Sequence, residues 1–268
     1  MKNRIAAILF SVLLPWGALH AEYLQPTQYG DFDSYVLALS WQPGFCQNLH
    51  QRGRKMPDEC QQQQESRDKT QFLSVHGLWP GLPASIAARG VDNKRWMRFG
   101  CATRPLPNMP EARASQKCAA PAPQLDAQLA AKLNEAMPGA GGRSCLERYE
   151  FSKHGACFGF SPNAYFATMI RLNQTLRQST LGHFLNAHYG QTVTRKAFNQ
   201  ALRQQFGDTS VKAVKLTCSG NPGWLTEIQI TLNAETINQP LDAKSFQSQP
   251  HPGNCGAKFR LDAVGYMQ

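Results

Sequence analysis

Eight cysteines constrain this chain more than any other feature of its sequence. An even number of cysteines in an exported protein indicates a framework of disulfides. A zinc site is the alternative, but it favours pairs spaced C-x2-C, whereas the two cysteines closest in sequence, Cys145 and Cys157, lie twelve residues apart. We therefore predict four disulfides, no metal and no cofactor. The eight positions are Cys46, Cys60, Cys101, Cys118, Cys145, Cys157, Cys218 and Cys255.

The N-terminal segment indicates export. Two basic residues precede an apolar run over residues 5–19, and small residues follow near Ala21. This pattern is typical of a secretory signal peptide over residues 1–21, which leaves a mature domain over 22–268. A membrane anchor is the alternative, but the run is shorter than the roughly 20 apolar residues a spanning helix needs, and Pro15 interrupts it. We expect a mature protein without membrane contact.

The charge of the chain favours a polyanionic partner. Its formal net charge is +10, which falls to +8 without Lys2 and Arg4. Such a balance suits a nucleic acid, a membrane surface or an acidic glycan. The only dense basic groups are RGRK over 52–55 and DNKRWMR over 92–98, and a solvated surface is the alternative interpretation of each.

The hydrophobic patterns predict a single α+β domain. Residues 46–69 are polar and predict a loop or a frayed helix, and residues 101–123 predict a long surface excursion. The fold class that we predict is an antiparallel central sheet with helices on one side, linked by disulfides, and a monomer is expected. Strands are predicted over 35–41, 72–76, 211–218, 225–232 and 259–264, and helices over 124–137, 145–157, 164–177 and 196–206.

The segment ERYEFSKHGAC, residues 147–157, concentrates chemistry. If it is helical, Glu150, Lys153 and His154 stand at i, i+3 and i+4 and share one face. Tyr149 lies at the edge of that face, one turn before Lys153. A helical ion pair beside a chance histidine is the alternative. The small residues after the histidine and the cysteine crosslink instead favour a preorganised catalytic site.

His76 is the second candidate. It ends a predicted strand and enters a predicted tight turn, HGLWPG, where Gly77 allows the backbone to bend and Trp79 supplies a flat apolar face. A single histidine at a strand end is commonly structural. Two histidines in different segments, one beside an acid and a lysine, suggest a general acid–base pair. Histidine suits both roles because its pKa of about 6.5 allows either form near neutrality.

Three segments resemble the T2 family of ribonucleases. FLSVHGLWP (72–80) and EFSKHGAC (150–157) are similar to the two signature segments of that family, and YVLALSWQPGFC (35–46) is similar to its opening strand. Together they cover about thirty residues in the right order. The resemblance implies a periplasmic RNA endonuclease that acts without metal through a 2′,3′-cyclic phosphate.

The resemblance also implies residue roles. His154 would be the general base and His76 the general acid, while Lys153 and Glu150 would contact the pentacovalent phosphate. Trp79 would stack on a base of the RNA.

Four positions depart from the family pattern, among them Phe151 in place of the usual tryptophan and Ala156 in place of the usual threonine. Tyr149 stands where the family often has a histidine, which leaves its contact with the phosphate open. Gly81 stands where an aspartate often reads the base. We therefore expect little preference among the four bases.

The resemblance bears on disulfide pairing as well. Cys46–Cys60 and Cys218–Cys255 are the pairs we expect first. For the remaining four cysteines, the family pattern favours Cys118–Cys157 with Cys101–Cys145 over the reverse pairing.

Two other functions remain open to this sequence. One is a secreted, inactive RNA- or polyanion-binding protein of the same fold, which could have lost any of the catalytic residues. The other is a zinc hydrolase using His76 and His154, which lacks a third ligand at a known spacing. The remaining histidines are interpreted as surface or structural residues: His50, His183, His188 and His251.

Overall fold

A computed structural model describes residues 22–61, 63, 66–107, 109–142, 144–221 and 223–265. The predicted signal peptide, residues 1–21, lies outside the described residues.

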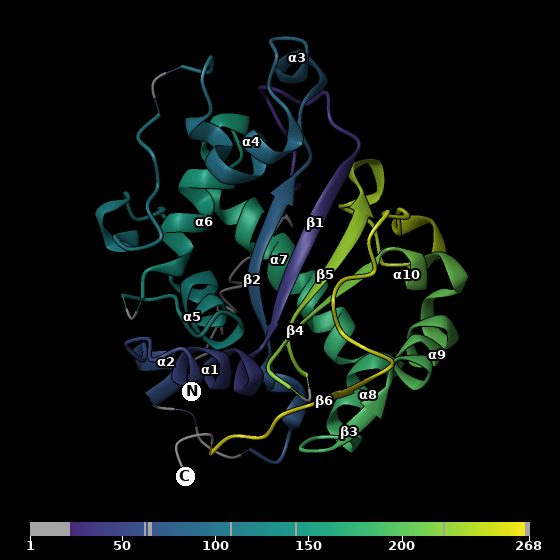
Figure 1. Ribbon diagram of the computed structural model, residues 1–268. Coiled ribbons are helices and arrows are strands. Elements are labelled where there is room, and N and C mark those ends of the chain that lie inside the picture. The colour runs from purple at the N-terminus through teal and green to yellow at the C-terminus, as the bar shows by residue number, and fades with distance from the viewer. Residues whose placement is uncertain are drawn as a thin grey trace, which may run out of the picture.

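A six-stranded sheet forms the frame of the described chain (Figure 1). Four neighbouring strands pair antiparallel, and a two-stranded antiparallel ribbon extends the sheet. The ribbon joins the rest through one parallel bridge, between Trp224 and Arg260. The predicted antiparallel sheet is therefore confirmed apart from this bridge. In spatial order the four strands are β2 (Leu73–Pro80), β1 (Ser34–Trp41), β5 (Trp224–Asn233) and β4 (Val214–Ser219), and the ribbon consists of β6 (Lys258–Arg260) and β3 (Thr192–Thr194).

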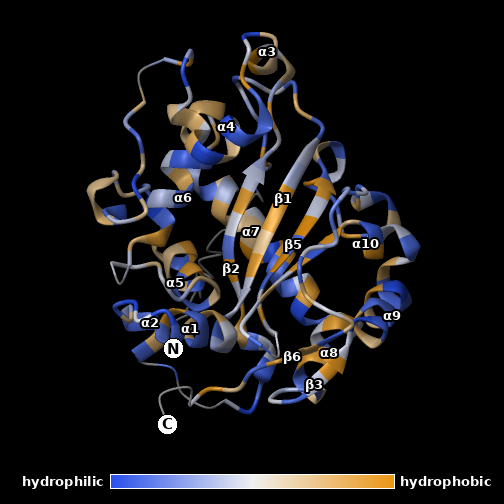
Figure 2. Cartoon of the chain, viewed as in Figure 1, coloured by the Kyte–Doolittle hydropathy of each residue, from blue (hydrophilic) through white to orange (hydrophobic). Residues whose placement is uncertain are grey.

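The two faces of this sheet differ in character. Along β5, Ile228, Ile230 and Leu232 are buried, whereas the residues between them are partly exposed. Because side chains alternate across a strand, one face enters the core and the other remains open. Helix α7 (Pro162–Arg177) lies behind the sheet in Figure 1, and its Tyr165 hydroxyl donates to the Leu78 carbonyl at 2.6 Å. The hydrophobic colour follows β1 and β5 in Figure 2, while α9 is largely hydrophilic.

Other helices lie beyond both edges of the sheet. In Figure 1, α4, α5 and α6 lie to one side of β2, α3 lies beyond the end of the sheet, and α8 to α10 lie to the other side of β5. The predicted fold class, an α+β domain with a sheet packed with several helices, is confirmed. These helices are α1 (Gln42–Gln51), α2 (Asp58–Gln61), α3 (Ala84–Ala87), α4 (Asn93–Phe99), α5 (Ala127–Ala136), α6 (Leu146–His154), α8 (Thr180–Ala187), α9 (Arg195–Phe206) and α10 (Asp208–Lys212).

Several predicted boundaries shift. The strand predicted over 72–76 continues through the HGLWP segment to Pro80, so that segment is not a turn. Pro80 is tolerated because it is the last residue of the strand on the outer edge of the sheet, where proline interrupts little of the hydrogen-bonded ladder. The strand predicted over 211–218 starts at Val214, because the residues before it belong to α10. Helices α4 and α8 were not predicted.

All eight cysteines form disulfides, as predicted. The pairs Cys46–Cys60 and Cys218–Cys255 are confirmed. The favoured pairing of the other four is wrong: the bonds are Cys101–Cys157 and Cys118–Cys145.

The length of α6 explains this second pairing. Cys145 caps the N-terminus of the helix, and Cys157 follows its C-terminus. A nine-residue helix is about 13 Å long, whereas bonded cysteines need Cα atoms within roughly 7 Å of each other. The turn that carries Cys101 lies against the C-terminal end of the helix, where a Cβ on Gly100 would come within 2.1 Å of the carbonyl oxygen of Lys153. Cys101 therefore bonds at that end, and Cys118 at the other.

Candidate active site

A β-bulge in β2 positions His76. The pairing of β1 with β2 shifts between Ala38, which is opposite Gly77, and Leu39, which is opposite Val75. His76 is the extra residue that this shift leaves without a partner, and bulges re-aim side chains in this way next to active sites. His76 thus lies within the strand, not at the strand end and turn predicted from the sequence.

Gly77 allows two segments to approach closely. A Cβ at this position would lie 2.2 Å from Oε2 of Glu150 and 2.4 Å from Nε1 of Trp79. No other residue fits without displacing both side chains. Gly77 was predicted to allow a bend of the backbone, but in the structure it leaves room for the Glu150 carboxylate.

Glu150 lies at the centre of the site and is 1 % exposed. Its Oε2 accepts a hydrogen bond of 2.7 Å from Nε1 of Trp79. Its Oε1 lies 3.6 Å from Nε2 of His76, and its Oε2 lies 3.9 Å from Nε2 of His154. The carboxylate therefore stands between the same nitrogen of the two histidines.

Trp79 separates the two imidazoles. Its indole stacks on His154 with ring centroids 5.5 Å apart, and meets His76 edge-on at 5.4 Å. Trp79 is only 9 % exposed and His154 only 4 %. Little of the Trp79 surface is thus open to solvent.

Lys153 and Tyr149 lie together at the edge of α6, as the helical spacing predicted. Nζ of Lys153 donates to the hydroxyl of Tyr149 at 3.3 Å and lies 5.4 Å from the centre of its ring. This contact holds the ammonium on the outer side of the helix turn that carries Glu150 and His154.

Glu227 is a site residue that sequence reasoning missed. Its Oε2 lies 2.7 Å from Nδ1 of His76, and its Oε1 accepts a hydrogen bond from Gln229. Glu227 belongs to the partly exposed set of β5 residues, so it projects from the open face of the sheet toward β2. The alternation of apolar and polar residues in LTEIQITL (225–232) predicted only that the Glu227 side chain points away from the core.

Lys117 is a second missed residue. It belongs to the 3-10 turn η3 (Lys117–Ala119), and Cys118–Cys145 fastens that turn to the start of α6. Lys117 lines a small cavity of about 100 Å³ together with His76. It is half-buried although both of its neighbours in the chain are exposed, so its side chain turns inward. Nothing in the sequence around Lys117, which only precedes a cysteine, predicts that its side chain lies beside His76.

The two histidines differ in pKa. Burial lowers the pKa of His76, but the hydrogen bond that it donates to Glu227 and the negative charges of Glu150 and Glu227 outweigh burial, so the pKa is raised. Burial lowers the pKa of His154, and the positive charges of Lys153 and His76 lower it further, well below its usual value. The surroundings thus shift His76 toward its protonated form and His154 toward its neutral form.

The two carboxyl groups differ as well. Burial raises the pKa of Glu150, and the charges of His76, Lys153 and Lys117 only partly offset that effect. Burial acts to raise the pKa of Glu227, but the hydrogen bond and positive charge of His76, the hydrogen bond from Gln229 and the charge of Lys215 together outweigh burial and hold that pKa below its usual value. Glu227 is therefore a stable anion beside His76, while Glu150 can take up a proton more readily.

Two features are absent from the described residues. These residues contain no group of three or more histidine, cysteine, aspartate or glutamate side chains arranged to hold a metal ion. Among their helices, none has the length and apolar character needed to cross a bilayer.

Two histidines around a shared carboxylate, with a lysine beside them, form the candidate site of this disulfide-linked α+β domain, and such a set of side chains is able to carry out acid–base catalysis. The model of the Ribonuclease T2 family matches residues 32–244. Ribonuclease I of Escherichia coli (strain K12) is 62% identical over 263 residues, which cover 98% of each protein. The chain belongs to the Ribonuclease T2 family.

More distant relatives extend the comparison. A probable ribonuclease of Haemophilus influenzae is 30% identical over 181 residues, covering 65% of this chain and 56% of its own length. The crystal structure of the self-incompatibility associated SF11-RNase of Nicotiana alata has a TM-score of 0.54 at 16% identity and covers 87% of this chain and 99% of that one. RNase NT, solved in complex with 5′-AMP, has a TM-score of 0.51 at 16% identity and covers 86% of this chain and 98% of its own. At such identities the two structures show the fold alone.

Proposed function

We propose that this T2-family endoribonuclease cleaves RNA with broad specificity, without a metal ion, through a 2′,3′-cyclic phosphate. One observation carries the proposal: Glu150 lies between a half-buried His76 whose pKa is raised and a buried His154 whose pKa is lowered. Paired groups whose environments separate their pKa values in this way are suited to opposite halves of one proton transfer.

His154 is the general base in this proposal. RNA carries its own nucleophile, the 2′-hydroxyl, which must lose a proton as it attacks the neighbouring phosphorus. Because its pKa is lowered, His154 is neutral near pH 7 and can accept that proton. Stacking on Trp79 fixes the plane of the imidazole at the position of attack.

His76 is the general acid. As the bond between phosphorus and the 5′-oxygen breaks, His76 donates a proton to the leaving oxygen, which becomes a 5′-hydroxyl. Glu227 accepts from Nδ1, so Nε2 carries the proton that is transferred. The remaining product is the 2′,3′-cyclic phosphate.

Lys153 and Glu150 serve the charge that develops on the phosphate. The non-bridging oxygens gain negative charge in the transition state, and a fixed ammonium nearby stabilises them. Lys153 supplies that cation. Glu150, whose pKa is raised, would donate a hydrogen bond when protonated and orient the histidines when ionised. Lys117, which lines the cavity at His76, adds a second positive charge on the opposite side.

The site also bears on the alternative functions. An inactive binding protein of this fold has no need for His76, Lys153 and His154 together, and all three are present. We further propose that residues 1–21 are a signal peptide, that the mature enzyme is a monomer in the periplasm, and that RNA is its partner. The four disulfides fit export, since such bonds persist in oxidising compartments.

One digestion tests the mechanism. Purified mature enzyme is incubated with RNA, and the new ends are identified by mass spectrometry. We expect 2′,3′-cyclic phosphates and 5′-hydroxyls, unchanged by a chelator, and no cleavage of DNA, which lacks the 2′-hydroxyl. New 5′-phosphates, or loss of activity on chelation, would refute the proposal in favour of water as the nucleophile or a metal enzyme.

A further inference from the structure

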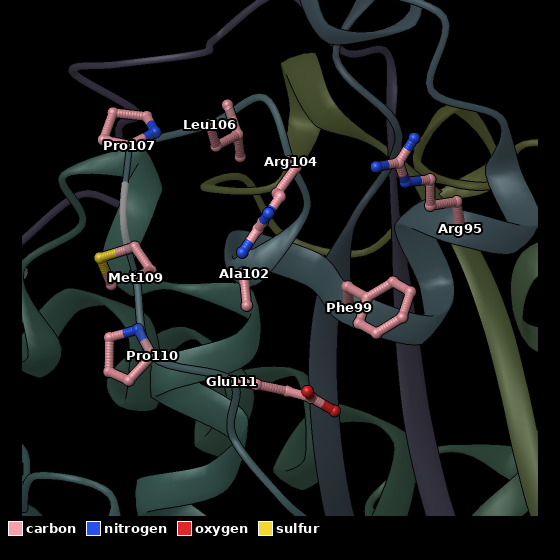
Figure 3. A pocket seen from close by; sticks show the side chains of 9 residues that line it. All are labelled: Arg95, Phe99, Ala102, Arg104, Leu106, Pro107, Met109, Pro110 and Glu111. Atoms are coloured by element: carbon pink, nitrogen blue, oxygen red, sulfur yellow. The ribbon is translucent and has the colours of Figure 1, made fainter.

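A second cavity lies beside the catalytic residues, on the outer side of α4. It measures about 560 Å³ and is walled by α4, by the 3-10 turn η2 (Gly100–Ala102) and by residues of 104–107 and 109–111. In Figure 3, Arg95 and Phe99 extend from α4, and Arg104 and Glu111 face them from the other wall. Its volume falls within the range of roughly 300–1,000 Å³ that small-molecule sites occupy.

The cavity is close to the reacting phosphate. Gly100 lies against the backbone of Lys153, where a Cβ would meet the carbonyl oxygen at 2.1 Å, and Ala102 of the same turn lines the cavity. Three residues of 3-10 helix span roughly 6 Å. The disulfide Cys101–Cys157 fixes this turn to the end of α6. An RNA strand leaving the site over Lys153 thus reaches the cavity within about one nucleotide.

The side chains of this cavity suit a nucleotide. Arg95 and Arg104 are exposed, and neither forms an ion pair with a described carboxylate. Guanidinium groups bind phosphate through paired donors and also stack on bases. Phe99 offers a flat ring, and the Arg98 guanidinium lies 5.0 Å from its centre. Single-strand binders combine a cationic groove with aromatic faces in this manner.

Glu111 adds a feature that phosphate binding alone does not explain. Its carboxylate extends beneath Phe99 in Figure 3, on the far wall from Arg95. A carboxylate repels phosphate but accepts hydrogen bonds from amino groups on base edges. The Glu111 carboxylate would also repel the carboxylates of an acidic peptide, whose acidic side chains offer no amino group to donate a hydrogen bond to it. This difference favours RNA as the occupant.

We infer that this cavity is an additional RNA subsite, which holds a nucleotide beyond the two that flank the cleaved bond. Phe99 stacks on its base, Arg95 and Arg104 bind its phosphate, and Glu111 accepts from the edge of the base. The basic group DNKRWMR of the sequence is thus a substrate surface. This inference rests on the proposed cleavage of RNA.

The test compares a dinucleoside phosphate with an octanucleotide that contains the same cleavable step. The variants are Arg95→Ala combined with Arg104→Ala, Phe99→Leu alone, and Arg52→Ala as a matched control at the C-terminus of α1. The ratio of kcat/KM on the octamer to kcat/KM on the dinucleotide should fall about tenfold for the double variant and roughly fivefold for Phe99→Leu. Arg52→Ala should leave the ratio unchanged.

A binding measurement separates this inference from the catalytic proposal. The dissociation constant of a 2′-O-methyl octamer, which cannot be cleaved, is measured by fluorescence anisotropy at several salt concentrations. For the double variant, the slope of log K against log salt should fall by about 0.7 to 1.4, because each phosphate contact on a single strand contributes roughly 0.7.

Three outcomes would overturn the inference. If both substrates lose activity equally, the variants act on the fold or on the catalytic residues, and the cavity is no subsite. An unchanged ratio and salt slope would exclude RNA from the cavity. An acidic peptide that binds with arginine dependence while the octamer does not would assign the cavity to a protein partner. A fourth outcome separates the two proposals. If the native enzyme does not cleave RNA, and its binding of the octamer still shows a salt slope that depends on the two arginines, the catalytic proposal fails and the subsite stands.

Discussion

His76 and His154 are the same side chain in two regions of opposite character. His76 projects from a strand bulge onto the open face of the sheet, and its side chain is 32% exposed. His154 ends a helix and is 4% exposed, stacked on Trp79. A carboxylate holds Nδ1 of the first at 2.7 Å, whereas a lysine is adjacent to the second in the chain.

This difference shows how one residue type supplies both an acid and a base. Histidine has a single intrinsic pKa of about 6.5, so the environment must separate the two roles. Glu227 favours the imidazolium at His76, and burial with Lys153 favours the neutral ring at His154. The pH range of activity should lie between the two shifted pKa values.

The largest expected effect comes from removing either histidine. His76→Ala and His154→Ala should each reduce kcat on RNA by about 10³- to 10⁴-fold, because each removes one proton-transfer partner. Initial rates on a fluorogenic oligonucleotide measure the loss. His183→Ala, on the exposed surface of α8, is the matched control and should retain full activity. If either the His76 or the His154 variant loses less than tenfold in kcat, that histidine is not the proton-transfer group proposed here.

Lys153→Ala should cost less, about 10²-fold in kcat, because the lysine stabilises charge and transfers no proton. The same change also removes a positive charge beside His154. Since that charge helps to lower the pKa of His154, the acid limb of the pH–rate profile should move to higher pH. A profile recorded from pH 4 to 9 checks both effects. An unmoved acid limb would mean that burial alone sets the pKa of His154.

Glu227→Gln should have a smaller effect on activity, and this effect should appear on the alkaline limb of the pH–rate profile. The amide still accepts from Nδ1 of His76 but carries no charge, so the raised pKa of His76 should fall. His76 then loses its proton at lower pH, and the alkaline limb moves toward neutrality. We expect the rate to fall several-fold at pH 8 and to change less at pH 6, because His76 would lose its proton at a lower pH. Glu235→Gln, an exposed carboxylate after β5, is the control. If the alkaline limb stays in place, a group other than His76 is the acid.

The surroundings of His154 could be predicted from the sequence better than those of His76. In α6, the spacing of Glu150, Lys153 and His154 places them on one helical face, because helical neighbours are determined by local periodicity. The partner of His76 could not be found in this way. Glu227 lies 151 residues further along the chain, and it meets His76 only because β1 brings β2 and β5 together.

The same distinction holds for the fold. Long amphipathic segments such as α7 and β5 were predicted close to their observed bounds, since their patterns repeat over many residues. The bulge in β2 was missed because it depends on register with β1, which no local pattern encodes. The pairing of Cys101 and Cys118 likewise depends on which end of α6 each segment meets, and spacing along the chain does not contain that information.

The smallest expected effect concerns the choice of base, on the His76 side of the site. Gly81 follows β2 and has no side chain to read a base edge, while Trp79 exposes only 9 % of its surface for stacking. Initial rates on the sixteen dinucleoside phosphates should therefore differ by less than about tenfold, because discrimination needs a buried polar contact.

Gly81→Asp should raise the relative rate on adenine-containing steps by a few-fold, since a carboxylate there can accept from the amino group of the base. A Cβ at Gly81 would meet the carbonyl oxygen and the hydroxyl of Ser34 at 3.2 Å, so the loop must move by only a few tenths of an ångström. Gly81→Ala carries that shift without the carboxylate and should show no new preference. If the initial rates of the unmodified enzyme on the sixteen dinucleoside phosphates differ by far more than tenfold, another side chain reads the base. The surface around His76, the proposed acid, would then contain a base-reading contact.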